Sequence, residues 1–192
     1  MFKTLIVENK IDFDSMKIIE FILKLKKESK GKKASNIGGW QSEFLDFNNP
    51  ILVNLTECIM QQGKEFCNIL DVREDLTLYI SSMWANVNEY KDSNQEHIHS
   101  GSLLSGVVYL KVPKKDCGYL EFIDPSVRLK ISISGKPYDE IYEKFNDFTT
   151  LRVQVIPTEK HIILFPSWLP HLVLPHLSHN LRISVSFNLN IK

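Results

Sequence analysis

The sequence predicts a mainly β fold, a two-sheet jelly-roll barrel flanked by N-terminal α-helices. Apolar residues recur at helical spacing only in the first third of the chain. From residue 76 onward, short runs rich in β-branched and aromatic residues alternate with turns that contain Pro or Gly. About eight such runs occur, which is the jelly-roll number. With 192 residues we expect one domain, 1–192, with a helical part at about 1–72 and a β-barrel core at about 76–192.

We expect two helices in the N-terminal part. The first covers residues 14–30, where Asp14 is a favourable N-cap and Gly31 ends the apolar pattern. The second covers residues 50–70, with a stripe of large apolar side chains. Lysines crowd the end of the first helix, where the macrodipole favours cations, so we expect them to face water, and a phosphate-binding patch is the alternative. These lysines are Lys24, Lys26, Lys27, Lys30, Lys32 and Lys33.

The β part divides into runs bounded by turn residues. The expected strands cover residues 76–80, 83–87, 104–112, 119–123, 128–134, 151–156, 161–165 and 181–190. Residues 135–145 interrupt this pattern, and we expect a short helix or a lid there.

Composition excludes several classes of protein. Lys plus Arg and Asp plus Glu both number 23, so the formal charge is zero and gives no indication of nucleic-acid binding. The first residues do not resemble a signal peptide, and no apolar run approaches the roughly 18 residues of a membrane helix. Three cysteines without CxxC spacing support neither a disulfide framework nor a zinc ribbon. We expect a soluble, cytoplasmic protein, and the sequence leaves open whether it is a monomer or a homodimer.

A pair of histidines is the most informative chemical feature. His97 and His99 are one residue apart on an extended segment, so their side chains project to the same side. A third imidazole would complete one face of an octahedral metal site, and His171 is the best candidate. Arg182 follows eleven residues later in an alternating run that places Arg182, Ser184 and Ser186 on one face. A buried arginine on such a face needs an anion. The remaining histidines lack such a pattern and are expected to be structural: His161, His176 and His179.

Together, four stretches resemble a known family. They are the HxH at 97–99, SGVVYL at 105–110, FPSWLPH at 165–171 and RISVSFN at 182–188. This set is similar to the Fe(II)- and 2-oxoglutarate-dependent oxygenases of bacteria and their phages, and residues 35–42 match a further motif of that group. The resemblance implies a double-stranded β-helix, the cupin-like form of the jelly roll. It also implies hydroxylation of an unidentified primary substrate by O2, with release of succinate and CO2.

The resemblance further implies roles for particular residues. Fe(II) would be held by His97, His99 and His171, and the far carboxylate of 2-oxoglutarate by Arg182 and Ser184. Two polar residues on neighbouring strands, Asn86 and Tyr109, are further candidates for contact with 2-oxoglutarate. Trp40 and Gln41 are expected near the mouth of the site, although a connector with Trp40 at the edge of the core is the simpler interpretation of that loop.

Three alternatives stay open. His99 stands where related enzymes have Asp or Glu, so Asp124 could be the third ligand and His99 only its support, although Asp-Pro more often begins a turn. A cupin-like enzyme with three histidines and no 2-oxoglutarate would suit the HxH pattern. A non-catalytic binding module on the same fold is the last alternative, because fold does not fix function.

Overall fold

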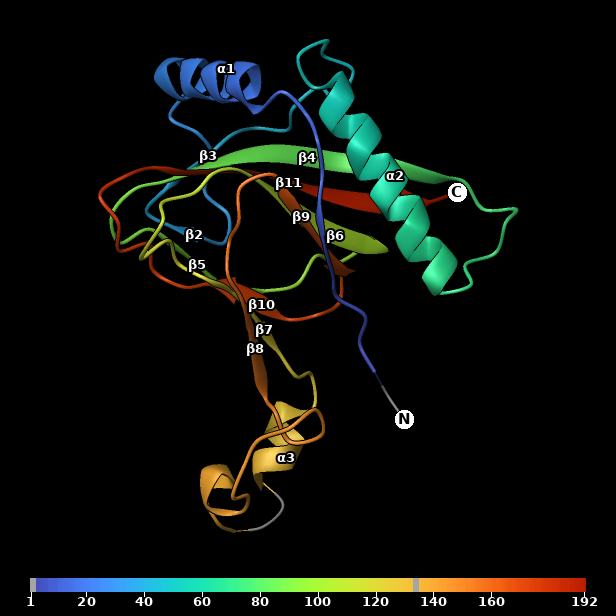
Figure 1. The fold of residues 1–192 in the computed structure, drawn as a ribbon, viewed down its shortest axis with the longest axis vertical. Helices are drawn as coiled ribbons and strands as arrows, with labels where there is room; N and C mark the ends of the chain where they lie inside the picture. The colour runs from blue at the N-terminus through green and yellow to red at the C-terminus, as the bar shows by residue number, and fades with distance from the viewer. Residues whose placement is uncertain (1–2, 133–134) are drawn as a thin grey trace.

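The computed structural model describes residues 3–132 and 135–192, and its framework is two antiparallel sheets (Figure 1). The predicted mainly β, two-sheet architecture is thereby confirmed. The larger sheet contains, in spatial order, β1 (Val7–Lys10), β9 (His161–Pro166), β6 (Leu104–Lys111), β11 (Arg182–Ile191), β4 (Leu78–Asn88) and β3 (Trp40–Gln41). The smaller sheet contains β2 (Asn36–Ile37), β5 (Ser93–His97), β10 (His171–Val173), β7 (Leu120–Ile123) and β8 (Arg152–Val155).

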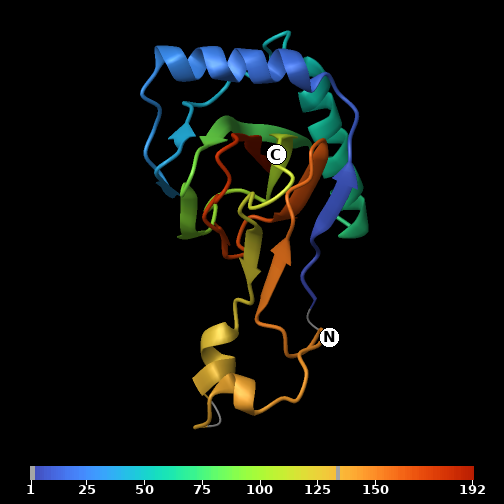
Figure 2. The same ribbon diagram turned by 60° about the vertical axis from the view of Figure 1, so that its left-hand side comes forward.

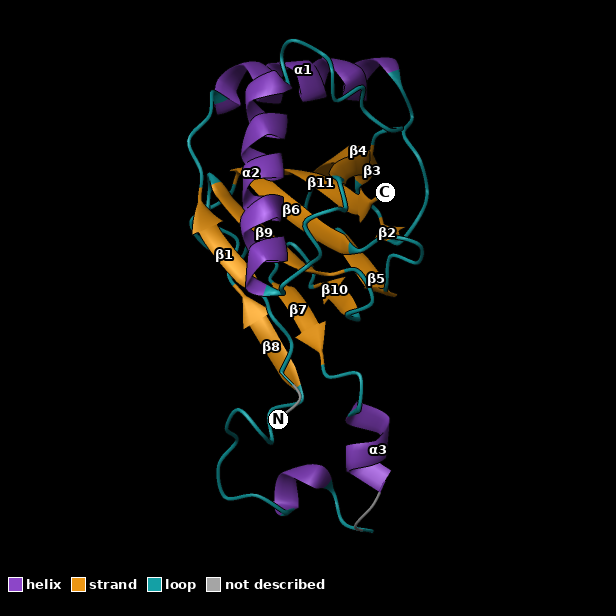
Figure 3. Cartoon of the chain, turned by 90° about the vertical axis from the view of Figure 1, so that its right-hand side faces the viewer, coloured by secondary structure: helices purple, strands orange, loops and turns teal. Residues whose placement is uncertain are grey.

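Two helices cover the outer face of the larger sheet (Figure 3). They are α1 (Ser15–Glu28) and α2 (Val53–Ile69), and both agree with the predicted helices. The Asp14 side chain accepts a hydrogen bond from the Met16 amide at 3.2 Å, which is the expected N-cap. None of the described helices combines the length and the apolar character that crossing a bilayer requires.

Side chains alternate between the two faces of β4 and β11. One face of each strand packs in the main core, and the other faces the interior between the sheets. On β4, Met83, Ala85 and Val87 are fully buried in the core shared with the helices, while the residues between them face the other way. On β11, Val185 and Phe187 belong to the same core. The helices therefore stabilise one face of the larger sheet, and the opposite face is free to carry polar side chains.

The strand predicted at 128–134 is wrong, because helix α3 (Val127–Ser132) lies there and residues 133–134 are outside the described part. Asp124 begins a turn in which its side chain accepts hydrogen bonds from the amide and hydroxyl of Ser126, so the chain leaves β7 and turns into a helix. A 3-10 helix, Tyr138–Glu140, follows. The described residues of 124–151, which we call the arm, project from the end of the barrel (Figure 2).

Other differences concern short elements. The two strands predicted at 76–80 and 83–87 are one strand, β4. Five short strands were not predicted, because two to five residues are too few to show a period: β1, β2, β3, β5 and β10. Two of them lie in residues 31–42, which we call the strap. Because β2 pairs with β5 and β3 pairs with β4, the strap crosses from the smaller sheet to the larger one.

Candidate active site

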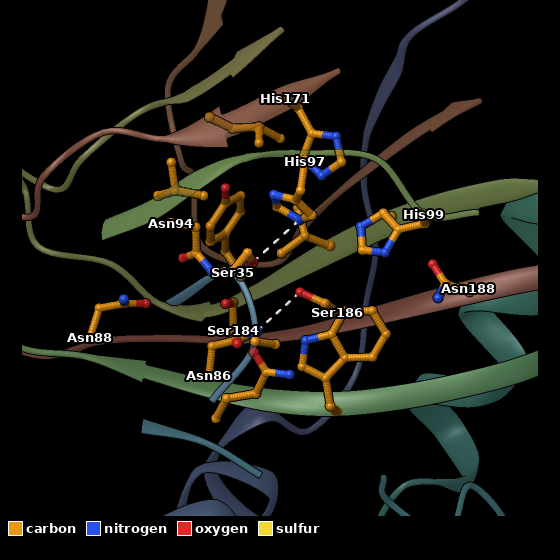
Figure 4. Close-up of a pocket in the computed structure, with 18 of the residues that line it drawn as sticks. Ser35, Asn86, Asn88, Asn94, His97, His99, His171, Ser184, Ser186 and Asn188 are labelled. Atoms are coloured by element: carbon orange, nitrogen blue, oxygen red, sulfur yellow. Dashed lines mark hydrogen bonds between the residues drawn. The ribbon is translucent and has the colours of Figure 1, made fainter. Parts of the chain in front are cut away.

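A cavity of about 420 Å³ lies between the two sheets and is closed at one edge by the strap (Figure 4). Its volume is in the range of small-molecule sites. Side chains from β4, β6 and β11 form one wall, and side chains from β5 and β10 form the other. Polar side chains of β4 and β11 thus border an open space between the sheets, beside a second apolar cluster that includes Tyr109, Phe122 and Phe165.

Three histidines from two segments meet in this cavity. His97 ends β5 and His171 begins β10, where the two residues are direct register partners. The amide of His99 donates a hydrogen bond to the carbonyl of Ser167 at 2.9 Å, which holds the loop after β5 against the loop before β10. One nitrogen from each of the three rings lies within 4.8 Å of the others, and Figure 4 shows the rings turned toward a common point. The spacing suits one metal ion.

Hydrogen bonds select the tautomer of two of these rings. A carbonyl oxygen only accepts, so Nδ1 of His97 donates to the Gln95 carbonyl at 2.7 Å and Nδ1 of His171 donates to the Leu169 carbonyl at 2.9 Å. Each neutral ring therefore presents Nε2 as a lone pair, the arrangement found in metal-binding histidines.

Burial keeps the three rings neutral. It lowers the pKa of His171 to about 3 and that of His99 to about 4, with a further contribution from the neighbouring His97. It also lowers the pKa of His97, against the hydrogen bond to Gln95. Since a metal binds only the unprotonated imidazole, the residues present fit a divalent cation at neutral pH.

Arg182 lies in the same cavity as a buried positive charge. The residue is 2% exposed, and its Nη1 donates to the carbonyls of Cys117 at 2.7 Å and Gly118 at 2.6 Å. Among the described residues, no carboxylate forms an ion pair with the guanidinium. Burial lowers its pKa, yet an arginine stays protonated in proteins. The cavity therefore offers an anion a buried, positively charged partner.

Ser184, Asn86 and Tyr109 form one row across the larger sheet, next to Arg182. Ser184 is the register partner of both Asn86 on β4 and Tyr109 on β6, and all three line the cavity. Asn86 donates from Nδ2 to the hydroxyl of Ser186 at 3.0 Å. Burial raises the pKa of Tyr109 to about 12 even though the nearby Arg182 acts to lower it. The phenol therefore stays protonated and can donate a hydrogen bond.

Asp124 is not part of the histidine cluster. Its carboxylate accepts hydrogen bonds from Ser126 and from the Lys130 ammonium at the base of the arm. Burial alone would raise the pKa of Asp124, but the hydrogen bonds from Lys130 and Ser126 outweigh it and lower the pKa. The other histidines also lie elsewhere: His161 contacts Glu8 at 2.9 Å, His176 contacts the Asn180 carbonyl at 2.7 Å and His179 stacks on Tyr90.

The expectation that Trp40 and Gln41 both lie near the mouth is half right. Gln41 lines the cavity, whereas Trp40 is buried in the core and donates from Nε1 to the Ser29 carbonyl at 2.9 Å. Neighbouring residues on a strand point to opposite sides, so only one of the pair can face the site.

Sequence reasoning missed several residues that line the cavity: Lys32, Ser35, Phe44, Trp84, Asn88, Asn94 and Asn188. Two of these share a face with residues that were predicted. Trp84 is two residues before the predicted Asn86 on β4, and Asn88 is two residues after it. Strand alternation could therefore have found them. Lys32, Ser35 and Phe44 come from the strap and the loop after it, and only tertiary contacts bring them to the cavity.

The chain was compared with known proteins. The family model described as "Putative 2OG-Fe(II) oxygenase" matches residues 82–188, which include all three clustered histidines and Arg182. No curated protein matches the sequence.

Solved structures are similar over nearly the whole chain. A Pseudomonas putida prolyl-4-hydroxylase has a TM-score of 0.63 at 14% identity, covering 96% of this chain and 91% of the other. A Trichoplax adhaerens prolyl hydroxylase, in complex with a hypoxia inducible factor peptide fragment, has a TM-score of 0.64 at 16% identity, covering 97% and 83%. HygX from Streptomyces hygroscopicus, with nickel and 2-oxoglutarate bound, has a TM-score of 0.60 at 12% identity, covering 97% and 83%. At these identities the similarity shows a shared fold, the expected double-stranded β-helix.

Proposed function

The chain belongs to the 2OG-Fe(II) oxygenase family, and from this premise we propose that it hydroxylates its primary substrate at a metal held by His97, His99 and His171. The protein is a 2-oxoglutarate- and Fe(II)-dependent oxygenase, so Fe(II) and 2-oxoglutarate are its cofactor and cosubstrate. The assignment of individual residues rests on one observation above all. Among the described residues no carboxylate forms an ion pair with the buried Arg182, which shares a cavity with three neutral imidazoles whose ring nitrogens lie within 4.8 Å of one another.

In this proposal the protein orients and shields the reactants. Bound Fe(II) supplies the oxidative chemistry, in which 2-oxoglutarate and O2 are consumed and succinate and CO2 are released. Arg182 binds the far carboxylate of 2-oxoglutarate through its guanidinium donors, and the Ser184 hydroxyl donates to the same group. Tyr109, which stays protonated, donates a further hydrogen bond, and Asn86 supplies its amide.

Arg182 also favours a 2-oxoglutarate-dependent oxygenase over the two alternative functions. A three-histidine enzyme that does not use 2-oxoglutarate has no need of a buried cation at the end of its pocket. Membership of an oxygenase family likewise argues against a non-catalytic binding module.

The test is anaerobic addition of Fe(II) and then 2-oxoglutarate, with the visible charge-transfer band of the chelate as readout. The parent protein should show the band and, once O2 is admitted, form succinate. His171→Ala should lose both while keeping its fold, because this variant removes one of three ligands from a preformed barrel. His161→Ala, whose ring lies outside the cluster, is the matched control and should behave as the parent does. Stoichiometric iron in His171→Ala would show that the ligand set is wrong.

A further inference from the structure

Four side chains form a row from the strap to the histidine cluster, which we call the aromatic row: Lys32, Phe44, Trp84 and His99. The Lys32 ammonium lies 5.0 Å from the centre of the Phe44 ring. The ring centres of Phe44 and Trp84 are 6.3 Å apart, and those of Trp84 and His99 are 5.7 Å apart. All four residues line the cavity. An aromatic surface, in which each ring is tilted against the next, thus lies directly beside one proposed metal ligand.

The aromatic row is separated from Arg182 along the sheet. Trp84 is the register partner of Ser186, whereas Arg182 is four residues earlier on the same strand. At the rise of a β-strand, four residues span roughly 13 Å. If 2-oxoglutarate reaches from the metal toward Arg182, as in the proposed function, the space beside Trp84 stays open for the primary substrate.

The charged side chains that line this space have one sign. Among the described residues that line the cavity, none is Asp or Glu, and the two charged residues are Lys32 and Arg182. Three neutral imidazoles leave the charge of a divalent metal intact, so dianionic 2-oxoglutarate cannot neutralise the metal and both cations. The site with its metal and cosubstrate therefore keeps a positive charge, which attracts anions and repels cations.

Lys32 is available to such an anion. Its nearest carboxylate is that of Glu43, at 3.8 Å, and both side chains are well exposed. Exposed ion pairs of this kind contribute little, so an incoming anion can replace Glu43 at small cost.

We propose that the primary substrate is an anion that lays a flat, uncharged group on Trp84 beside His99 and places its negative group against Lys32. This rests on the proposed function, because the metal and 2-oxoglutarate define which part of the cavity is left. A carboxylate and a phosphate share the chemistry that Lys32 recognises.

The experiment titrates four aromatic probes into the anaerobic complex of the full chain with Fe(II) and 2-oxoglutarate. Benzoate and phenyl phosphate carry an anion, benzyl alcohol is neutral and benzylamine is a cation. Binding is followed by the change in the charge-transfer band and by quenching of tryptophan fluorescence. Both anions should bind more tightly than benzyl alcohol, and benzylamine should bind least. If benzoate binds more tightly than phenyl phosphate, the negative group of the substrate is a carboxylate. The opposite order indicates a phosphate.

Two variants locate the interactions. Lys32→Met should reduce the preference for anions by about threefold to fivefold, the effect of losing an exposed ion pair. Lys33→Met is the matched control, because Lys33 is exposed and does not line the cavity, and it should keep the preference. Trp84→Leu should weaken every aromatic probe by about tenfold while the charge-transfer band persists.

Several results would overturn the proposal. With the band intact, benzylamine binding as tightly as benzoate, unchanged anion preference in Lys32→Met, or no binding of any probe would each do so. Failure of the parent to form the band at all would instead contradict the proposed function. Lys32 is on the surface, so its variant keeps the test valid even where Trp84→Leu does not fold.

Discussion

The buried guanidinium of Arg182 requires an anion in the cavity. Its charge is desolvated, two carbonyls satisfy only part of its donor capacity, and the rest of the guanidinium borders the cavity. We expect Arg182→Ala to weaken 2-oxoglutarate binding by about 2 to 5 kcal/mol, the range for losing one partner of a buried charge pair. Iron affinity should change little.

Calorimetric titration of 2-oxoglutarate into the anaerobic Fe(II) protein measures this effect. Arg152→Ala is a suitable control, because Arg152 lies on β8, pairs with Glu121 and does not line the cavity. Equal affinity in Arg182→Ala and the parent would refute the assignment of Arg182.

His99 raises a separate question of charge at the metal. Where a related triad has a carboxylate, this site has a third neutral imidazole, and Asp124 is engaged with Ser126 and Lys130 at the base of the arm. We predict that His99→Asp retains iron, because a carboxylate is also a good ligand at this position. Asp124→Asn should leave iron content and succinate formation nearly unchanged.

Metal analysis of the purified variants checks both statements. The three-histidine ligand set would be wrong if Asp124→Asn folded normally without iron while His99→Ala remained loaded.

The histidine cluster should also make the metal-free protein sensitive to acid. The pKa values of His99 and His171, about 4 and about 3 in the fold, lie below the ordinary value near 6.5. Between these values the unfolded chain binds protons that the native state does not, so stability is complete above pH 6.5 and falls as the pH falls toward 3. At pH 5 the loss should be about 2 kcal/mol for each histidine.

Urea unfolding of the metal-free protein at pH 7.5 and pH 5 measures this loss. His171→Gln, which has no titrating ring at that position, should lose less stability over the same interval. The same pH dependence in both proteins would show that the buried imidazole is not the cause.

Among the elements, the strap determines how the cavity is closed. It turns at Gly38, where φ is +66° and an added Cβ would lie 2.0 Å from Oδ1 of Asp92. Asp92 cannot move freely, since its other carboxylate oxygen accepts a hydrogen bond from the Glu89 amide at 2.6 Å. We expect Gly38→Ala to cost the left-handed backbone strain of about 1 kcal/mol plus a similar amount for displacing Asp92.

Gly101→Ala separates these two contributions. Gly101 also has a positive φ, +82°, but an added Cβ there would meet no atom within 4 Å. The free energy of unfolding of the Gly101→Ala variant should fall by the backbone strain alone, roughly half the loss in Gly38→Ala. Equal losses in the two variants would show that the contact with Asp92 is unimportant.

For the whole molecule, the arm and the barrel make different contributions. No described residue of the arm lines the cavity, and Figure 2 shows the arm extending away from the sheets. Ile123 and Arg152 are register partners where β7 ends and β8 begins, so a short turn can join the two strands directly. Replacing residues 126–149 with a Gly-Ser linker should therefore leave iron and 2-oxoglutarate binding unchanged.

The charge-transfer band and a thermal melt of the shortened protein test this expectation. The sequence also allowed a lid at residues 135–145. If these residues were a lid, the shortened protein would instead bind iron and 2-oxoglutarate more weakly or release them faster. Loss of the band with an intact melt would support the lid.

Local patterns in the sequence were enough to predict the two long helices, the long strands and the most conspicuous chemistry. Period two along residues 181–190 placed Arg182, Ser184 and Ser186 on one face, as the structure has them. The HxH spacing likewise predicted that His97 and His99 address one point. These features depend on neighbours within a few residues, and that is the range over which side-chain periodicity carries information.

Tertiary structure decided the rest, because it depends on register and on contacts between distant segments. The pairing of His171 with His97 completes the cluster, and within the described part of the chain no carboxylate forms an ion pair with Arg182, whose guanidinium borders the cavity. The helix α3, mistaken for a strand, forms because Asp124 turns the chain away from any partner strand. The aromatic row joins the strap, the loop after it, β4 and the loop after β5, and no periodicity links segments so far apart in the chain.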